Sequence, residues 1–363
     1  MTTSERVAVV GTGLIGTSIA MAAAHGGDRV RGFDLDPDVA VVASGRAGFE
    51  IAATLEECVR SATLVFVSTP VDIVPQLVVK ALEATDDAAV VDVASVKSHV
   101  VLEVEAKAGS RVVRYVPSHP MGGSERSGPE HASPTILDGA VWVVTPASGT
   151  ETDAVARVEA WISRAGARPI RMDPARHDRL IAVVSHLPQV AATTLMALAA
   201  TDEASDPEIL RLAAGGFRDL TRLAASDPAL WSGILLANRV AVMTAIDRYS
   251  ERLGAMRDLV ARGDADAIAE VFAEAKAARL TLAAKPKVRA GVAVLQLPVP
   301  DRPGVLADVT SAMGQVDVNI EDLQIVHSPE GGRGTLHVTV AVDAVDPAEV
   351  ALRGHGFDPV RIA

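Results

Sequence analysis

The segment VAVVGTGLIG, at residues 7–16, constrains the fold of this chain more than any other. A run of β-branched and small apolar residues ends in glycines spaced as G-x-G-x-x-G, and an apolar, helix-like run follows directly. In that context the first glycine permits a tight turn, the second lets a ligand approach the backbone, and the third lets helix and strand pack closely. The first amides of the helix then face an anion. We predict that the turn holds the pyrophosphate of a dinucleotide through residues Gly11, Gly13, Leu14, Ile15 and Gly16. A turn needed only for packing is the alternative.

An acidic residue at the end of the next strand-like run favours the dinucleotide interpretation. The run RVRGF ends at Asp34, where a carboxylate accepts hydrogen bonds from an adenosine ribose. The same carboxylate repels the 2′-phosphate of NADP, and Leu35 and Asp36 stand where NADP sites usually have a basic residue. We therefore expect NAD as the cofactor. Ser68 and Thr69 end a later run, TLVFVSTP, and are expected to contact it too, because ligands of such sheets lie beyond the carboxyl ends of the strands.

The pattern along the chain predicts three domains of an α/β protein. Up to about residue 172, short β-branched runs alternate with amphipathic ones, as in a doubly wound parallel sheet of the Rossmann type. Over residues 173–285 strand-like runs vanish and apolar residues recur at helical spacing, which predicts an all-helical domain. The linker-like AAKPKVRAG leads into a small α/β unit, so the third domain is expected at residues 286–363.

Composition excludes several classes of partner. A net charge of −12 and a pI near 5.2 oppose binding of nucleic acid over most of the surface. The mean hydropathy of +0.26 reflects alanine and valine, and charges interrupt the apolar runs, so we expect no membrane-spanning segment. The start MTTSER lacks the features of a signal peptide, which predicts a cytoplasmic protein. With Cys58 as the single cysteine, no metal site is expected.

A histidine in SHPMGGSERSG, residues 118–128, is the candidate base. The segment follows the strand-like run VVRYV, so His119 is expected at the carboxyl edge of the sheet, near the nicotinamide. Removing hydride from a carbon that bears a hydroxyl also requires loss of the hydroxyl proton, and histidine titrates near working pH. Ser124 and Glu125 are expected to face the substrate. A loop histidine satisfied by its neighbours is the alternative for His119, and a helix cap is the alternative for Ser95 in DVASVK.

The set of motifs resembles the prephenate and arogenate dehydrogenases of tyrosine biosynthesis. The resemblance rests on GTGLIG, DVASVK, SHPMGGSERSG, the HD of ARHDRL, SHLPQ and GGFRDLTRLAASDPALW. It implies that His119 accepts the proton of the ring hydroxyl, that Ser95 hydrogen-bonds that hydroxyl region and that Arg222 pairs with a substrate carboxylate. It further implies a homodimer and a charged gate over the pocket from Glu125, Arg218 and Asp219. A solvated helix face is the alternative for the last two.

The helix expected to begin near His177 has its own spacing. The spacing places four residues on one face of this helix: Asp178, Ala182, Ser185 and Gln189. His186 lies off that face, and we expect it to have a structural role. Pro188 is expected to bend this helix.

Gln189 leaves the choice of substrate open. It stands where many prephenate-using relatives carry a second histidine. A neutral amide suits either the keto group of prephenate or the ammonium of arogenate.

The C-terminal segments PVPDRPGVLADVTSAM and VNIEDLQIV resemble an ACT domain, a βαββαβ module that binds amino acids. Asp301, Gly304 and Asn319 match the ligand-loop positions of that family. The resemblance implies regulation by tyrosine or another aromatic amino acid. A helix cap at Asp301 and a turn role for Asn319 are the alternatives.

Taken with the resemblance, the residues predict NAD-dependent oxidative decarboxylation of prephenate to 4-hydroxyphenylpyruvate, or of arogenate to tyrosine. Another nicotinamide-linked hydroxy-acid dehydrogenase is one alternative, although such enzymes commonly use a lysine as base. A non-catalytic sensor of NAD and amino acids is the other.

Overall fold

The computed structural model describes residues 4–122, 127–203, 206, 208–283, 292–300, 302–327 and 333–362. The chain divides into two compact units. Unit 1 comprises Met1–Leu210 with Leu220–Ser250, and unit 2 comprises Arg211–Asp219 with Glu251–Ala363. The long runs expected to be a helical domain therefore contribute to both units.

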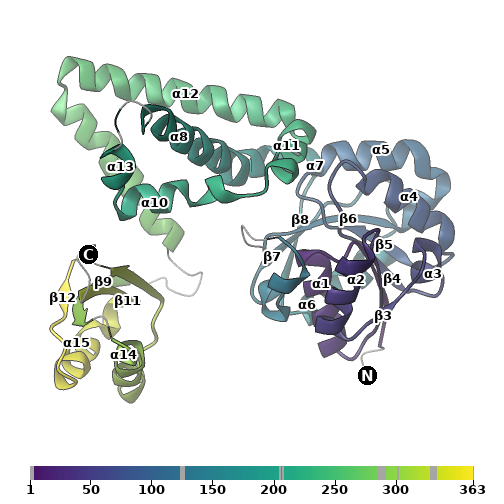
Figure 1. The fold of residues 1–363 in the computed structure, drawn as a ribbon, viewed down its shortest axis with the longest axis horizontal. Helices are drawn as coiled ribbons and strands as arrows, with labels where there is room; N and C mark the ends of the chain where they lie inside the picture. The colour runs from purple at the N-terminus through teal and green to yellow at the C-terminus, as the bar shows by residue number, and fades with distance from the viewer. Residues whose placement is uncertain are drawn as a thin grey trace. The chain divides into compact units, whose positions relative to one another are not determined.

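The described part of unit 1 is built on an eight-stranded sheet with the strand order β3-β2-β1-β4-β5-β6-β7-β8 (Figure 1). Neighbouring strands are parallel except β6 and β7, so the predicted doubly wound sheet is confirmed with one antiparallel pair. The strand order reverses direction between β1 and β4, which is where ligands bind in such sheets. The strands are β1 (Arg6–Val10), β2 (Arg29–Phe33), β3 (Glu50–Ile51), β4 (Leu64–Val67), β5 (Ala89–Asp92), β6 (Tyr115–Pro120), β7 (Val141–Val144) and β8 (Arg168–Arg171).

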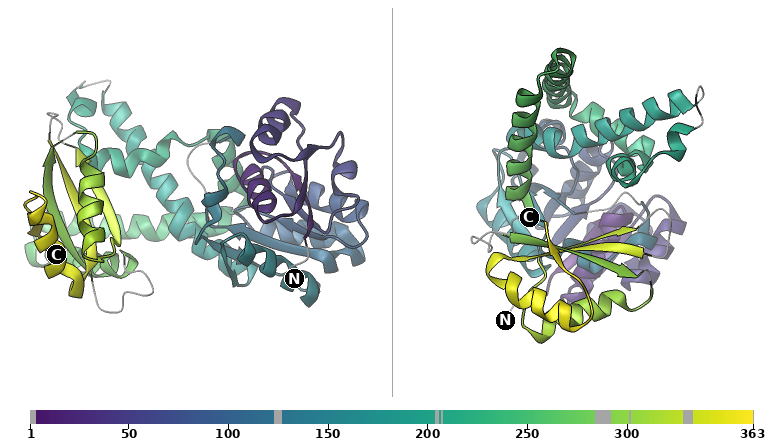
Figure 2. Two further views of the ribbon diagram at one scale, coloured as in Figure 1. Left: turned by 90° about the horizontal axis from the view of Figure 1, so that it is seen from below. Right: turned by 90° about the vertical axis from the view of Figure 1, so that its left-hand side faces the viewer.

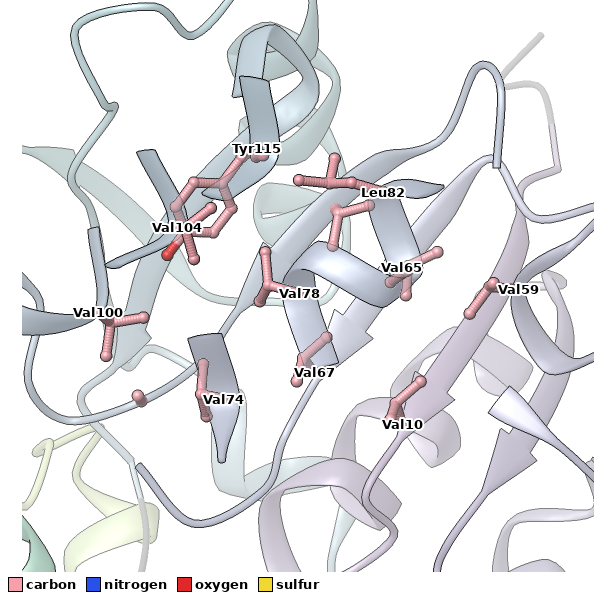
Figure 3. Packing of buried hydrophobic residues seen from close by; sticks show 14 of the residues in the cluster. Val10, Val59, Val65, Val67, Val74, Val78, Leu82, Val100, Val104 and Tyr115 are labelled. Atoms are coloured by element: carbon pink, nitrogen blue, oxygen red, sulfur yellow. The ribbon is translucent and has the colours of Figure 1, made fainter. Parts of the chain in front are cut away.

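Helices cover both faces of this sheet, which explains its uninterrupted apolar strands. Val7 and Val9 of β1 enter one hydrophobic cluster, while Ala8 and Val10 enter the other. Figure 3 shows part of the second cluster, where Val67 lies near the side chains of α4. The first face is covered by α1 (Leu14–His25), α2 (Pro37–Ala47) and α6 (Thr152–Arg164), and the second by α3 (Leu55–Val59), α4 (Val74–Ala84) and α5 (Ser98–Ala108).

The strand expected at VVRYV begins later than its sequence suggests. Residues Gly109–Arg114 form a 3₁₀ turn, and β6 starts only at Tyr115. The cause is Arg114, whose guanidinium donates to the carbonyl of Leu82 (2.8 Å) and to the hydroxyl of Thr85 (2.8 Å) at the end of α4. These tertiary bonds override the β propensity of the two valines.

Helices alone occur among the described residues between Pro174 and Ala283, as predicted. They are α7 (Pro174–Ile181), α8 (Leu187–Glu203), α9 (Glu208–Arg211), α10 (Gly215–Thr221), α11 (Pro228–Ala237), α12 (Arg239–Arg262) and α13 (Ala265–Ala283).

Pro188 is accommodated by a π-helical turn rather than by an interrupted helix. Residues Ala182–His186 form this turn between α7 and α8, and the Leu187 amide bonds the carbonyl of Ala182. The wider turn shifts the helical register, so His186 is fully buried although the spacing places it off the face that carries Asp178 and Gln189. Its buried Nδ1 lies 3.2 Å from the side-chain amide of Asn238.

The expectation that charges interrupt every long apolar run is wrong for one helix. The continuous helix Pro174–Glu203 has 30 residues and reaches a mean hydropathy of 1.5, enough by length and composition to cross a bilayer. The bent pair α11 and α12 passes the same test only when taken together. A core helix of a soluble protein also passes it, and Pro174–Glu203 carries buried polar side chains, including His177, Asp178 and Gln189, that bond to other segments.

The C-terminal part of unit 2 has the predicted βαββαβ order. Its sheet, β10-β11-β9-β12, is antiparallel, and α14 and α15 lie on one face of it (Figure 2). Leu295 and Leu297 pack there against Val309, Met313 and Leu352. The elements are β9 (Val292–Pro300), α14 (Val305–Gln315), β10 (Asp322–His327), β11 (Arg333–Ala341), α15 (Val345–Gly354) and β12 (Val360–Arg361). The predicted linker, apart from its first residue, lies outside the described residues.

Candidate active site

The glycine turn between β1 and α1 has the geometry of a phosphate-binding loop. Gly11 has φ +87°, and a Cβ there would lie 2.5 Å from the carbonyl oxygen of Ser68. A Cβ on Gly16 would lie 1.9 Å from the carbonyl oxygen of Gly11, so turn and helix pack too closely for any side chain. A Cβ on Gly13 would meet no atom within 4 Å, which leaves open space over the helix N-terminus. Leu14 begins α1, whose first turn carries no acidic side chain to repel a phosphate.

Asp34 follows β2 and faces this turn. Its Oδ2 accepts a hydrogen bond from the backbone amide of Thr12 (2.7 Å), and its Oδ1 accepts one from the amide of Asp36 (3.1 Å). The next residue, Leu35, is 77% exposed and has no charge with which to hold a 2′-phosphate. A carboxylate is therefore held beside the glycine turn, and the position after it has no cationic side chain.

Ser68 and Thr69 continue β4 at the same edge of the sheet. The Ser68 amide donates to the carbonyl of Val10 (2.7 Å), which keeps the two strand ends together. The buried hydroxyl of Thr69 has no hydrogen-bond partner among the described residues, as expected of a group that contacts a ligand.

His119 lies within β6, one residue before its end, rather than in the following loop. Its register partner on β7 is Val143, and it remains partly exposed. Because β6 runs parallel to β5, His119 is at the same carboxyl edge as the glycine turn. The sheet therefore fixes the backbone of the candidate base.

A hydrogen-bonded series runs from His119 through His177 to Asp178. Its Nδ1 lies 3.0 Å from Nε2 of His177, and the Nδ1 of His177 lies 2.8 Å from Oδ1 of Asp178. Both partners are on α7 and are buried. The motif HD was visible in the sequence, but nothing in its spacing connects His177 to a strand 58 residues earlier.

Asp178 also fixes the start of α5. Its two carboxylate oxygens accept hydrogen bonds from the backbone amides of Lys97 and Ser98, each at 2.8 Å. Lys97 is the N-cap residue of that helix, so the alternative role of Ser95 as the cap is wrong. Ser95 is half-buried in the connection between β5 and α5.

The buried side chain of Lys97 holds the backbone beside the histidine. Its ammonium donates to the carbonyl of Ser118 (2.6 Å) and forms an ion pair with Asp92, both side chains being fully buried. Tyr115 donates its hydroxyl to the second oxygen of Asp92 (2.6 Å). The two strand ends are thus joined through a network in which each charge has a partner.

The surroundings of His119 favour its neutral form. Burial lowers its pKa well below the usual range, and the nearby His177 and the charge of Lys97 lower it further. Asp178 acts in the opposite direction without reversing the shift. A neutral imidazole at neutral pH is the form that accepts a proton.

Gln189 is hydrogen-bonded to the backbone next to Arg222. The Gln189 side chain is buried, and its Nε2 donates to the carbonyl of Leu223 (2.7 Å), the residue after Arg222. Its Oε1 accepts from the Ser226 hydroxyl (3.4 Å). Gln189 therefore anchors the 3₁₀ turn Arg222–Ala225, and the Arg222 side chain is exposed at its start.

The other candidate substrate residues are not all placed. Ser124 and Glu125 lie outside the described residues. Arg218 and Asp219 are exposed on α10 and belong to unit 2, whereas His119 belongs to unit 1.

A cavity of about 230 Å³ lies in the C-terminal βαββαβ module, where β9 leads into α14. Gly304 is in its wall with φ +89°, as the N-cap residue of α14. Asn319 instead donates to the carboxylate of Glu321 (2.5 Å) within its own turn. Asp301 lies outside the described residues.

Three family models match the chain in succession. They are the prephenate dehydrogenase nucleotide-binding domain over residues 19–171, the prephenate dehydrogenase dimerization domain over residues 173–274 and the ACT domain over residues 293–353.

Curated relatives agree with these models. Prephenate dehydrogenase of Bacillus subtilis (strain 168) is 31% identical over 348 residues, which cover 93% of each chain. Cyclohexadienyl dehydrogenase of Zymomonas mobilis is 32% identical over 289 residues, which cover 78% of this chain and 97% of that protein.

A solved structure extends the similarity to the fold. Prephenate dehydrogenase from A. aeolicus, in complex with hydroxyphenyl propionate and NAD+, superposes with a TM-score of 0.72 and 29% identity, covering 77% of this chain and 99% of that one. The two prephenate dehydrogenase models together cover β6 with His119 and the helix that carries His177. This chain belongs to the prephenate dehydrogenase family and carries a C-terminal ACT domain.

Proposed function

We propose that this chain catalyses the NAD-dependent oxidative decarboxylation of prephenate to 4-hydroxyphenylpyruvate, with His119 as the proton acceptor. The observation that carries the proposal is a histidine at the carboxyl edge of the sheet, tied through its Nδ1 to a buried histidine and carboxylate. The relatives named prephenate and cyclohexadienyl dehydrogenase support the same chemistry.

Each part of the site has a role in this reaction. The turn at Gly11, Gly13 and Gly16 binds the pyrophosphate and Asp34 binds the ribose, with Leu14, Ile15, Ser68 and Thr69 lining the cofactor. NAD, when bound, takes up the hydride. His119 removes the hydroxyl proton, and Ser95 orients the same oxygen. Decarboxylation then restores aromaticity, so the protein mainly orients the ring and anchors its carboxylates.

The substrate carboxylate is assigned to Arg222, because a guanidinium fork matches a carboxylate. Gln189 acts on the substrate by holding the turn that carries this arginine. Ser124, Glu125, Arg218 and Asp219 are proposed as further substrate residues. These assignments rest on the resemblance of FRDLTR and SERSG to the family motifs.

Arogenate is the second candidate substrate, because Gln189 stands where many prephenate-using relatives carry a histidine and leaves the choice open. Initial rates with prephenate and arogenate, each with NAD and with NADP, test both. We expect NADH formation with prephenate and slower rates with NADP. No turnover of either cyclohexadienyl compound would leave the non-catalytic sensor as the better account, and turnover of another hydroxy acid alone would favour the other dehydrogenase class.

We further propose a cytoplasmic homodimer with domains at residues 1–172, 173–285 and 286–363. The matched dimerization domain supports the dimer, as do large exposed apolar side chains on α11 and α12, among them Leu236, Val240 and Met243. Tyrosine or another aromatic amino acid is proposed to bind the ACT domain near Asp301, Gly304 and Asn319. Calorimetry of the full chain with tyrosine and phenylalanine checks this, and an absence of binding heat with either contradicts it.

Replacing Asp34 with asparagine is expected to raise the KM for NAD by about 10- to 100-fold, because a charge-assisted hydrogen bond to the ribose is lost. The relative rate with NADP should rise, since the repulsion of its 2′-phosphate also disappears. Steady-state kinetics with both cofactors measure the two effects. An unchanged KM for NAD would remove Asp34 from the cofactor site.

A further inference from the structure

The bonds around Asp178 determine which of its neighbours carry protons. Its carboxylate accepts from the amides of Lys97 and Ser98 and lies 2.8 Å from Nδ1 of His177. Burial alone would raise the pKa of Asp178, but the bonds from His177 and the two amides outweigh it, and the pKa is lowered. Asp178 is thus an anion that only accepts hydrogen bonds, so the Nδ1 of His177 must carry a proton.

The same reasoning continues outward to His119. When His177 carries this one proton, its Nε2 is bare and accepts a hydrogen bond. The Nδ1 of His119, at 3.0 Å, must then be the donor. This tautomer leaves the Nε2 of His119 without a proton and free to accept one.

We propose that His177 and Asp178 are positioning residues that hold His119 in its Nε2-accepting tautomer, and that His177 holds a proton reversibly during turnover. The proposal rests on the assignment of His119 as the base. It adds a proton reservoir that is sealed from solvent, since His177 is fully buried and Asp178 is 4% exposed.

The reaction has no net uptake or release of this proton, because the proton that leaves the hydroxyl returns to the same oxygen after decarboxylation. As the ring carbon gives up hydride, the hydroxyl proton passes to Nε2 of His119 and the O–H electron pair becomes the second bond of the carbonyl. The Nδ1 proton of His119 moves to Nε2 of His177, whose own proton stays on Nδ1 and remains hydrogen-bonded to the Asp178 carboxylate. When carbon dioxide leaves, the electron pair of the broken C–C bond enters the ring and charges the carbonyl oxygen as a phenolate. The protons then shift back, and the oxygen recovers its proton.

The charges around His119 and His177 favour transfer of the proton from His119 to His177. The buried ammonium of Lys97, itself paired with Asp92, lies near His119, and this cation opposes an imidazolium at His119. On the other side the imidazolium of His177 would be in direct contact with the Asp178 carboxylate. His186, on the π-helical turn, is neutral because burial lowers its pKa to about 4.

The variant His177→Gln separates the reservoir from simple orientation. A glutamine oxygen accepts the hydrogen bond from Nδ1 of His119 but takes no proton, and the cap on α5 is untouched. We expect kcat to fall about 10- to 100-fold with the KM values for prephenate and NAD within about threefold of wild type. The matched control is His186→Gln. His186 is a buried histidine on the same continuous helix, but it is not hydrogen-bonded to His119, His177 or the Asp178 carboxylate, so this variant should keep kcat within about threefold of wild type. Wild-type kcat in His177→Gln, or an equal loss in both variants, would overturn the proposal.

A spectroscopic test is independent of activity. In the full-length wild type, ¹⁵N chemical shifts of the histidine rings should show protons on Nδ1 of both His119 and His177. In Asp178→Asn the amide donates instead, so both rings should switch to the Nε2-protonated tautomer, as happens when a triad aspartate is replaced. A wild-type His119 protonated on Nε2 would contradict the proposal. Should His119→Asn retain turnover, the base assignment itself fails; should it be inactive while His177→Gln is fully active, only the reservoir fails.

Discussion

Replacing His119 with asparagine should lower kcat by about 10²- to 10⁴-fold, the contribution of a positioned general base. Asparagine retains a short polar side chain next to His177, but it has no group that takes up the hydroxyl proton. The glycine turn and Asp34 are on other strands, so NAD binding should persist. Steady-state kinetics with prephenate, together with calorimetric titration of NAD, measure both quantities.

The matched control for this variant is His99→Asn. His99 is exposed on α5, where its Nε2 lies 3.5 Å from a carboxylate oxygen of Glu103, one turn away. Its replacement should leave kcat unchanged. A His119→Asn enzyme with kcat near the wild-type value would show that another group takes the proton, and a simultaneous loss of NAD binding would mean that the substitution damages the cofactor site.

Replacing Lys97 with methionine should lower the free energy of unfolding of unit 1 by about 3–5 kcal/mol, the typical cost of removing one partner from a buried ion pair. Asp92 would keep the hydroxyl of Tyr115 but lose its counter-charge in a fully buried position. The carbonyl of Ser118 would lose its donor as well. Denaturant titration of the transition assigned to unit 1 measures the change.

Two comparisons make this prediction specific. Lys107→Met removes an exposed lysine that pairs with Glu103 on α5, and it should change the unfolding free energy by less than about 1 kcal/mol. Adding Asp92→Asn to Lys97→Met should recover part of the loss, because the unpaired charge is then gone. If Lys97→Met is as stable as Lys107→Met, the buried pair is not what holds β5 and β6 together.

The cofactor site was predictable because its signals are local. The glycine spacing, the preceding apolar strand and Asp34 all lie within one strand-turn-helix-strand unit, where periodicity and turn chemistry decide the structure. The same holds for the βαββαβ module, whose alternating strands bury one face under two helices.

The partners of the base were not predictable in the same way. His177 reaches His119 only because α7 packs against α5 and brings His177 to β6, and Lys97, which follows β5, reaches the Ser118 carbonyl on the neighbouring strand. The burial of His186 depends on a π-helical turn, which adds one residue to the helical register. The i, i+3 and i+4 spacing of an α-helix therefore does not predict which face His186 occupies. The late start of β6 has the same origin, because Arg114 takes its partners from α4.

A crystal structure of the enzyme with NAD and a phenolic product analogue tests the central claim most directly. The claim predicts that Nε2 of His119 lies about 3 Å from the phenolic oxygen, with Nδ1 still bonded to His177 and the ring facing the nicotinamide. A His119 side chain turned away from the ligand, or a phenolic oxygen whose hydrogen-bonding group is another residue, would contradict it.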